Sequence, residues 1–148
     1  MDCPKDYLCC MKRILFAALL SILTSGILLA QDTATTFSGL KYVVLEEGDG
    51  REAYANRIVT VQYTGRFEDG TIFDSAWSTP FQFVTGHGQI IKGWDEGIRL
   101  MSEGSRYLFI IPPKLGYGKK GYGDIIPPNT TLYFEVRLLK VENLWLIP

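Results

Sequence analysis

The fold is decided by residues 61–75, which read VQYTGRFEDGTIFDS. Just before the turn, residues 58–64 alternate apolar and polar side chains, which is the pattern of a strand with one buried face. Asp69 and Gly70 together form a signal for a tight turn, so the chain is predicted to fold back here. The stretch is therefore expected to be an antiparallel β-hairpin with a two-residue loop.

That loop pairs Phe67 with Ile72 and Gly65 with Asp74 across the expected hairpin. The diagonal neighbour of Asp74 on the same face is Tyr63, about 7–8 Å away between backbones, which a tyrosine hydroxyl can span. Tyr63 is expected to face the core, so Asp74 should point inward as a buried carboxylate. Because a buried charge without a partner is costly, the sequence predicts a hydrogen bond between Tyr63 and Asp74. The alternative is that Asp74 only caps the turn.

The rest of the chain predicts further strands and one short helix. Strand-like runs occupy residues 41–46, 81–84, 106–111 and 131–139. Only residues 90–101 show a helical period, with Trp94 and Ile98 on its apolar side and Gly104 after it as a stop signal. Nothing else can cover the apolar side of the helix or of the sheet, so the two must pack together. The predicted fold class is α+β.

The N-terminal residues 1–30 have the order of a secretory signal peptide. A basic start at residues 11–13 precedes the uncharged apolar run 14–30, and the chain turns polar at Gln31. Cleavage after Ala30 is expected, with export to the bacterial periplasm. The alternative is an inner-membrane anchor formed by residues 14–30, a run just under a comfortable spanning length. Residues 31–38 then form a linker and residues 39–148 form the domain.

Composition and residue counts exclude several classes of function. The net charge is −1, so nucleic acid is not an expected partner. The three cysteines, Cys3, Cys9 and Cys10, precede the apolar run, and cleavage leaves no disulfide, zinc site or thiol nucleophile. His87 is the single histidine and lacks partners for a metal site. No metal or cofactor is therefore expected.

Three separated motifs resemble the FKBP-type peptidyl-prolyl cis-trans isomerases. Residues 61–75 are similar to the hairpin of that family, and residues 89–97, QIIKGWDEG, look like its V-I-x-G-W-x-E-G helix start. Residues 117–118 and then 125–136 are similar to its Y-G loop and final strand. The match runs in order from about residue 39 to residue 142. It implies an FKBP-like half β-barrel, in which a twisted antiparallel sheet wraps around one short helix with a pocket between them.

The resemblance also implies which residues line the pocket. Carried over position by position, they are Tyr63, Phe73, Asp74, Phe81, Ile90, Ile91, Trp94, Tyr117, Ile126 and Phe134. Trp94 is expected to form the floor, while the Ile91 backbone N–H and the Tyr117 hydroxyl donate hydrogen bonds to substrate carbonyls. Two rim positions depart from the family pattern. Gln89 stands where an acidic residue is common, and Tyr122 stands where histidine is frequent.

The implied activity is cis-trans rotation about Xaa-Pro bonds in exported proteins as they fold. This rotation faces a barrier of about 18–20 kcal/mol because the amide is conjugated. No covalent bond breaks, so neither a nucleophile nor a cofactor is needed, and an apolar aromatic pocket that prefers the twisted amide lowers the barrier. The alternative is a non-catalytic peptide-binding or chaperone module on the same fold.

The expected partners are proline-containing unfolded or partly folded polypeptides, together with the macrolide inhibitors of the family. Residues 80–94 leave no room for an inserted chaperone domain, and residues 31–38 are too few for a dimerisation arm, so a monomer is expected. The apolar tail, residues 144–148, is predicted to pack back on the barrel, with a partner contact as the alternative.

Overall fold

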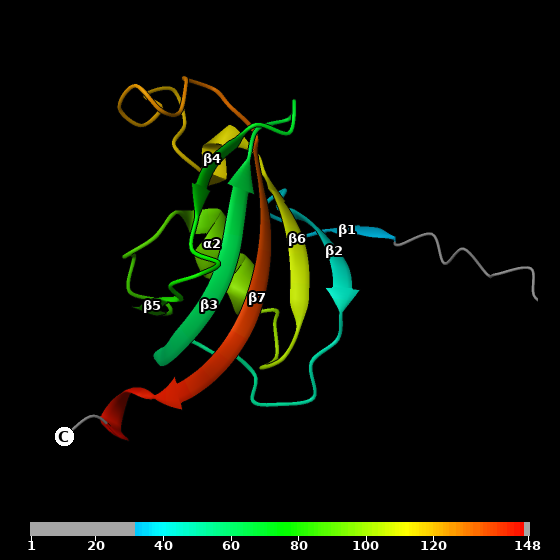
Figure 1. Cartoon of the computed structure of the whole chain (residues 1–148), viewed down its shortest axis with the longest axis vertical. Helices are drawn as coiled ribbons and strands as arrows, with labels where there is room; N and C mark the ends of the chain where they lie inside the picture. The colour runs from blue at the N-terminus through cyan, green and yellow to red at the C-terminus, as the bar shows by residue number, and fades with distance from the viewer. Residues whose placement is uncertain (1–31, 147–148) are drawn as a thin grey trace, which may run out of the picture. The chain divides into compact units, whose positions relative to one another are not determined.

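The computed structural model describes residues 32–146 of the chain (Figure 1). In chain order its elements, with η marking a 3-10 helix, are β1 (Thr33–Thr35), β2 (Lys41–Glu46), β3 (Arg57–Arg66), β4 (Ile72–Ser75), β5 (Phe81–Val84), α2 (Lys92–Ile98), β6 (Arg106–Ile111), η1 (Pro113–Leu115), β7 (Leu132–Asn143) and η2 (Leu144–Leu146). The predicted signal peptide or anchor, residues 1–30, lies outside the described residues. Between residues 32 and 146, no helix is both long enough and apolar enough to cross a membrane.

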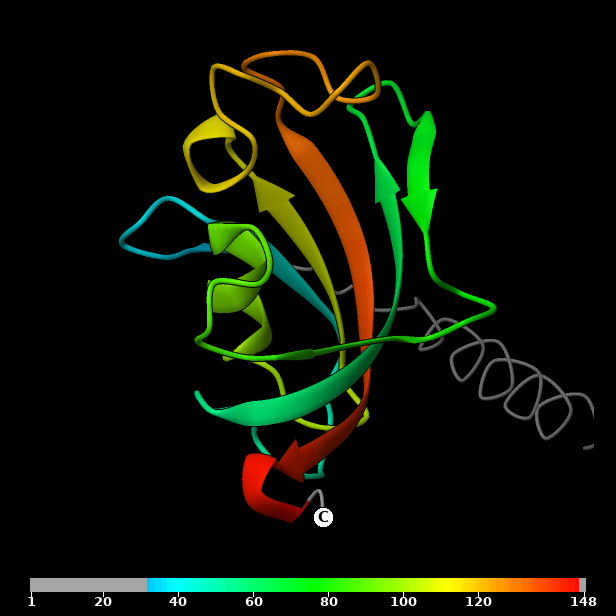
Figure 2. The same ribbon diagram turned by 90° about the vertical axis from the view of Figure 1, so that its left-hand side faces the viewer.

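The strands form one antiparallel sheet in the order β1-β2-β6-β7-β3-β4, and β5 also pairs with β3. The first half of β3, Ile58 to Val61, pairs with β5, and its later residues, Thr64 to Arg66, pair with β4. Between these two parts the register against β7 shifts, because Thr60 pairs with Lys140 and Val61 with Leu138, which leaves Leu139 as the extra residue of a bulge in β7. Figures 1 and 2 show that β3 and β7 curve around α2, which lies on the concave side of the sheet. The predicted half β-barrel is therefore confirmed.

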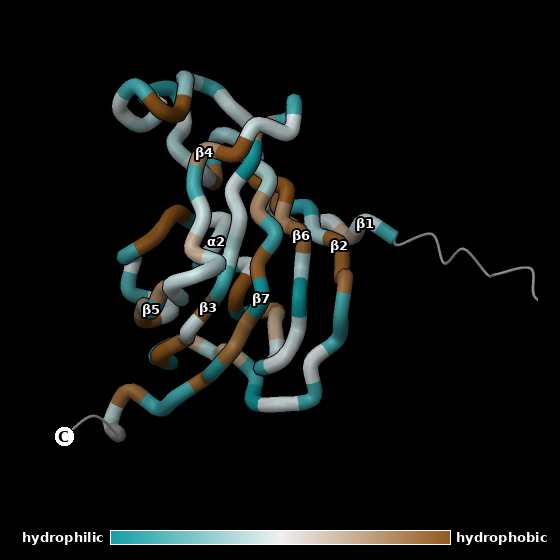
Figure 3. The backbone as a smooth tube through the Cα atoms, in the orientation of Figure 1, coloured by the Kyte–Doolittle hydropathy of each residue, from teal (hydrophilic) through white to brown (hydrophobic). Residues whose placement is uncertain are grey.

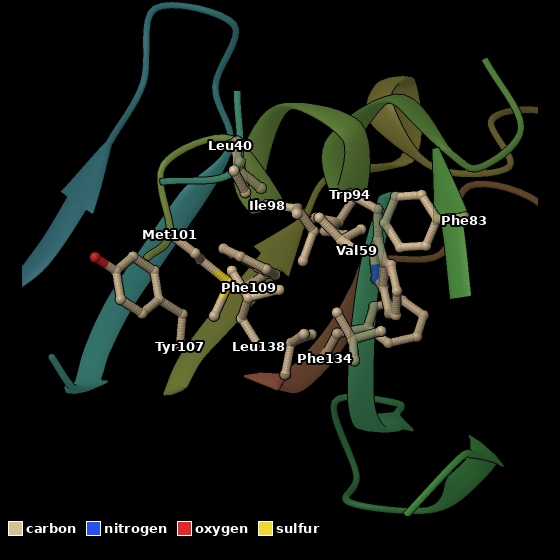
Figure 4. Close-up of a cluster of buried hydrophobic side chains, with 14 of the residues drawn as sticks. Leu40, Val59, Phe83, Trp94, Ile98, Met101, Tyr107, Phe109, Phe134 and Leu138 are labelled. Atoms are coloured by element: carbon tan, nitrogen blue, oxygen red, sulfur yellow. The ribbon is translucent and has the colours of Figure 1, made fainter. Parts of the chain in front are cut away.

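The core lies between the concave face of the sheet and α2. Along β7, apolar and polar residues alternate (Figure 3), so Leu132, Phe134 and Val136 are buried while Tyr133 and Glu135 remain partly exposed. Strand β6 buries every second residue in the same way. These side chains meet Trp94 and other residues of the helix in one cluster, part of which is drawn in Figure 4. Burial of this cluster is the main force that keeps the helix on the sheet.

Two glycines let α2 approach β6 closely. A Cβ atom on Gly97 would lie 2.7 Å from the ring of Phe109, and one on Gly93 would lie 2.6 Å from the side chain of Ile111. The apolar period of residues 90–101 predicts a longer helix than the structure has. Helix α2 begins at Lys92 and ends at Ile98. The N–H groups of Leu100 and Met101 donate to carbonyl oxygens three residues back rather than four, which closes the helix in tight turns.

The hairpin turn differs from the predicted two-residue loop. The Phe67 N–H donates to the Thr71 carbonyl oxygen at 2.9 Å, so three residues form the loop. The last of them, Gly70, has a φ of +86°, a conformation that suits glycine and ends a three-residue loop of this kind. The carboxylate of Asp69 accepts a hydrogen bond from the Thr71 N–H at 2.8 Å, which stabilises this wider turn.

The wider turn changes part of the predicted register. Ile72 pairs with Arg66, so its predicted pairing with Phe67 is wrong. The register then shifts by one residue, and Gly65 pairs with Asp74 as predicted. The bulge therefore corrects the offset that the turn introduces, and the face on which Asp74 lies is unchanged.

Both ends of the described chain add detail that the sequence did not reveal. Residues 33–35, within the segment expected to be a linker, form the edge strand β1 and pair with β2. The turn after β1 is linked to α2 by a hydrogen bond, in which the Ser38 hydroxyl donates to a carboxylate oxygen of Glu96 at 2.7 Å.

At the C-terminal end, the side chain of Trp145 is 85% exposed, so the prediction that the tail packs back on the barrel is wrong for this side chain.

Candidate active site

A pocket of about 210 Å³ opens between α2, strands β3 to β5 and the loop after η1. Nine residues line it: Tyr63, Asp74, Phe81, Gln89, Ile90, Ile91, Trp94, Tyr117 and Phe134. Eight of them belong to the ten pocket residues that the resemblance implied, and the ninth, Gln89, is one of the two rim positions. Asp74 is the only one of them with a charged side chain, so the wall is mainly apolar and aromatic.

The floor of the pocket is a packed group of aromatic rings around Trp94, which is 4% exposed (Figure 4). The Tyr63 ring meets the Trp94 ring edge to face, with centroids 4.8 Å apart. The Phe134 ring does the same at 5.2 Å. Edge-to-face pairs of this kind hold their rings in one orientation. The floor is therefore a preformed surface on which a flat apolar ligand group can rest.

The predicted pair of Tyr63 and Asp74 is present in the structure. The Tyr63 hydroxyl donates a hydrogen bond to Asp74 Oδ2 at 2.7 Å. Burial, and then this hydrogen bond to a carboxylate, raise the pKa of Tyr63 well above its usual value, so the phenol stays protonated. The expectation that Asp74 is buried is wrong, because β4 is an edge strand and the carboxylate is exposed at the pocket mouth.

Two of the ten implied pocket residues, Phe73 and Ile126, and one of the two rim positions, Tyr122, do not line the pocket. Phe73 lies behind it, where its ring meets Phe134 edge to face at 5.4 Å. Ile126 is 3% exposed and belongs to the core cluster. Tyr122 is exposed, and its ring lies 5.1 Å from that of Tyr117. These residues support the wall or its rim instead of forming the inner surface.

The two residues expected to donate hydrogen bonds to substrate carbonyls, Ile91 and Tyr117, both line the pocket. Ile91 directly precedes α2 with an extended backbone, and within residues 32–146 no oxygen accepts its N–H. Tyr117 lies in the loop after η1, lines the pocket and is partly buried. Burial, followed by its neighbours Tyr122 and Asp74, raises the pKa of Tyr117, so its hydroxyl remains a donor at neutral pH.

Gly65 supports the site through its missing side chain, a role that neither the strand pattern nor the family resemblance predicted. A Cβ atom at Gly65 would lie 2.7 Å from the ring of Phe134 and 2.8 Å from that of Phe73. The missing side chain therefore makes room for the ring pair behind the pocket. The signal was a glycine in the interior of a strand, which often marks a close approach.

Comparison with known proteins shows the family. Residues 50–139 match the family model described as FKBP-type peptidyl-prolyl cis-trans isomerase. The chain is 50% identical over 99 residues to the FK506-binding protein of Neisseria meningitidis serogroup A, covering 66% of this chain and 91% of that protein. It is 47% identical over 107 residues to the peptidyl-prolyl cis-trans isomerase Fkbp12 of Drosophila melanogaster, covering 70% and 99%.

A solved structure agrees with these matches. The peptidyl-prolyl cis-trans isomerase of Pseudomonas syringae pv. tomato superimposes with a TM-score of 0.70 at 30% identity, covering 97% of this chain and 99% of that one. The family model spans most of the sheet, the helix and the pocket described above. The chain therefore belongs to the FKBP-type peptidyl-prolyl cis-trans isomerases and is an enzyme of that class.

Proposed function

We propose that the pocket between α2 and the sheet is the place where this isomerase binds an Xaa-Pro segment and favours its twisted amide. The observation that carries the proposal is the composition of the wall, in which aromatic and aliphatic side chains surround one exposed carboxylate. The proline ring fits a floor made by the Trp94 indole. The substrates are unfolded or partly folded polypeptides that contain proline.

The chemistry needs little more than preferential binding. A planar Xaa-Pro amide is polar because it is conjugated, and twisting it removes that conjugation and much of the polarity. An apolar wall therefore favours the twisted form over the planar one. A thousandfold acceleration requires only about 4 kcal/mol of such preference. The Ile91 N–H and the Tyr117 hydroxyl are the groups proposed to hold the carbonyls that flank the twisting bond.

Asp74 is proposed to act together with Tyr63. Their hydrogen bond fixes the wall at the point where the carboxylate faces the pocket. In that place the negative charge lies beside the carbonyl carbon of the twisting amide. The carboxylate is exposed, so its field is partly screened by solvent, and fixing the wall is the larger part of its role.

A double-mutant cycle tests this pair. We expect Tyr63→Phe and Asp74→Asn each to lower kcat/KM for Xaa-Pro peptides, with a coupling of at least about 0.5 kcal/mol, because Tyr63→Phe removes the donor of this hydrogen bond and Asp74→Asn replaces its charged acceptor with a weaker, neutral one. The matched control is Tyr133→Phe, which removes a hydroxyl from the opposite face of the sheet. Strict additivity of the Tyr63 and Asp74 changes, with activity barely altered, would show that Asp74 is only a turn residue.

The same pocket is proposed to take macrolide inhibitors. The relative from Neisseria meningitidis is named for its binding of FK506. An apolar ring system can rest on the floor that the Trp94 indole provides to the proline ring. Such a ligand would compete with the peptide for one site.

We further propose that the isomerase acts as a monomer.

We also propose that the enzyme works on exported proteins, after removal of residues 1–30. The order of basic, apolar and polar residues in the sequence supports this. We expect protein recovered from its native compartment to have the mass of residues 31–148, which intact-mass spectrometry measures directly. A mass that retains residues 14–30 would establish the membrane anchor instead.

A further inference from the structure

The side chain of Gln89 is held in one orientation at the pocket mouth. Its Oε1 atom accepts a hydrogen bond from the backbone N–H of Val84 at 3.0 Å. A backbone N–H can only donate, so the oxygen of the amide must face Val84 and the NH₂ group must lie on the other side. The orientation of this side-chain amide is therefore determined by the chain itself.

The loop that carries Gln89 is also tied to the helix. The Gly86 N–H donates to Asp95 Oδ1 in α2 at 2.6 Å. With Gln89 bonded to the end of β5, the connection from β5 to α2 is braced on both sides. A donor placed on such a loop loses little conformational entropy when it binds a ligand.

Gln89 lines the pocket together with Phe81 and Ile90, and it is exposed to an incoming ligand. In the described part of the chain, no oxygen accepts a hydrogen bond from its Nε2 atom. The NH₂ group of Gln89 is therefore available at the pocket mouth as a third donor, beside the Ile91 N–H and the Tyr117 hydroxyl. The peptide groups that flank a proline offer carbonyl oxygens as matching acceptors, because proline itself has no N–H to donate.

We propose that Gln89 is a specificity-determining residue whose Nε2 donates a hydrogen bond to a backbone carbonyl oxygen of the bound peptide beside the proline. The inference rests on the proposed role of this pocket as the substrate site. In this inference Gln89 binds the peptide, while Tyr63 and Asp74 shape the wall of the pocket.

The choice of glutamine over glutamate has a consequence for charge. A glutamate here could accept the same hydrogen bond from Val84, but its second oxygen would present an acceptor and a negative charge to the peptide carbonyl. That charge would add to Asp74, which is now the only charge in the lining. Glutamine therefore allows the pocket to accept peptides with an acidic residue next to proline, which two carboxylates would repel.

The test compares Gln89→Glu with Gln89→Ala in steady-state isomerisation of peptides that carry Leu, Glu or Lys before the proline. Gln89→Glu keeps the brace to Val84 and loses the donor, whereas Gln89→Ala loses both. We expect Gln89→Glu to raise KM by about threefold to tenfold for the Leu peptide, with kcat nearly unchanged. The loss should be largest for the Glu peptide and smallest for the Lys peptide.

Gln82→Glu is the matched control. It makes the same change of charge on β5, at a side chain that bonds Thr60 and does not line the pocket. Its kinetics should equal those of the unaltered protein for all three peptides. Thermal unfolding of each variant confirms that all are folded.

The remaining outcomes overturn the inference. If Gln89→Glu behaves as the unaltered protein while Gln89→Ala is impaired, Gln89 is only a brace for the loop. If neither variant changes KM, it has no role in binding. Asp74→Asn and Phe81→Ala separate this failure from that of the proposed function. If both leave the kinetics unchanged, the pocket is not the substrate site, and if they impair activity while Gln89→Glu does not, only the role of Gln89 is refuted.

Discussion

Replacing Phe134 with alanine is expected to lower the free energy of unfolding by about 3–5 kcal/mol and to remove most of the isomerase activity. Phe134 is 5% exposed, and its ring meets those of Tyr63, Phe73 and Trp94 at centroid distances of 6.0, 5.4 and 5.2 Å. Truncation leaves a cavity that three rigid rings cannot fill by small movements. The same three rings orient the floor of the pocket, so stability and activity should fall together.

The experiment is equilibrium unfolding in urea combined with a peptide isomerisation assay at a temperature where the variant remains folded. Tyr133→Ala is the matched control, because it removes an aromatic ring from the next position of β7 on the partly exposed face. It should cost clearly less stability and leave activity intact. Phe134→Leu should restore much of the stability, because it refills most of the volume. A loss below about 1 kcal/mol for Phe134→Ala would contradict the ring packing described above.

Gly97→Ala should destabilise the protein by about 1–3 kcal/mol, although alanine usually favours a helix over glycine by about 1 kcal/mol. A Cβ atom at this position would lie 2.7 Å from Cε1 of Phe109 and 2.9 Å from its Cζ. Phe109 is fully buried, so its ring cannot move aside without disturbing the core. The helix must then shift away from β6. Because α2 carries Trp94 and follows Ile91, the shift should also lower activity.

A second substitution identifies the cause. Phe109→Leu removes the ring atoms that the new methyl group would strike, so it should cost less in the Gly97→Ala protein than in the unaltered one. The two changes are measured singly and together by urea unfolding, as a double-mutant cycle. A Gly97→Ala protein that is as stable as the unaltered one, or more stable, would refute the close contact between α2 and β6.

The local pattern of the sequence determined where most strands lie. The runs at residues 41–46, 81–84 and 106–111 coincide with β2, β5 and β6. Strand period and turn residues act over a few neighbours, and burial of one face strengthens the same pattern. The face of Asp74 was also predictable, because the side-chain period of two leaves only two choices, and the turn and the bulge together preserve the right one.

The tertiary structure decided what depends on contacts between distant residues. Strand β1 is only three residues long, too short for a periodic signal, and it exists because β2 offers it an edge. Helix α2 stops at Ile98 although the apolar period continues, because tight turns then lead the chain towards β6.

The depth of each site residue was also decided by the tertiary structure. Alternation shows which face a side chain occupies, but only the packing of other elements shows whether that face is covered. Asp74 is exposed because β4 lies at the sheet edge, and Phe73 lies behind the pocket because its ring packs on Phe134. The bond between Gln89 and Val84 depends on how the loop closes in three dimensions, which no spacing in the sequence encodes. Periodicity is a property of one segment, whereas the burial and the orientation of a side chain depend on how several segments pack together.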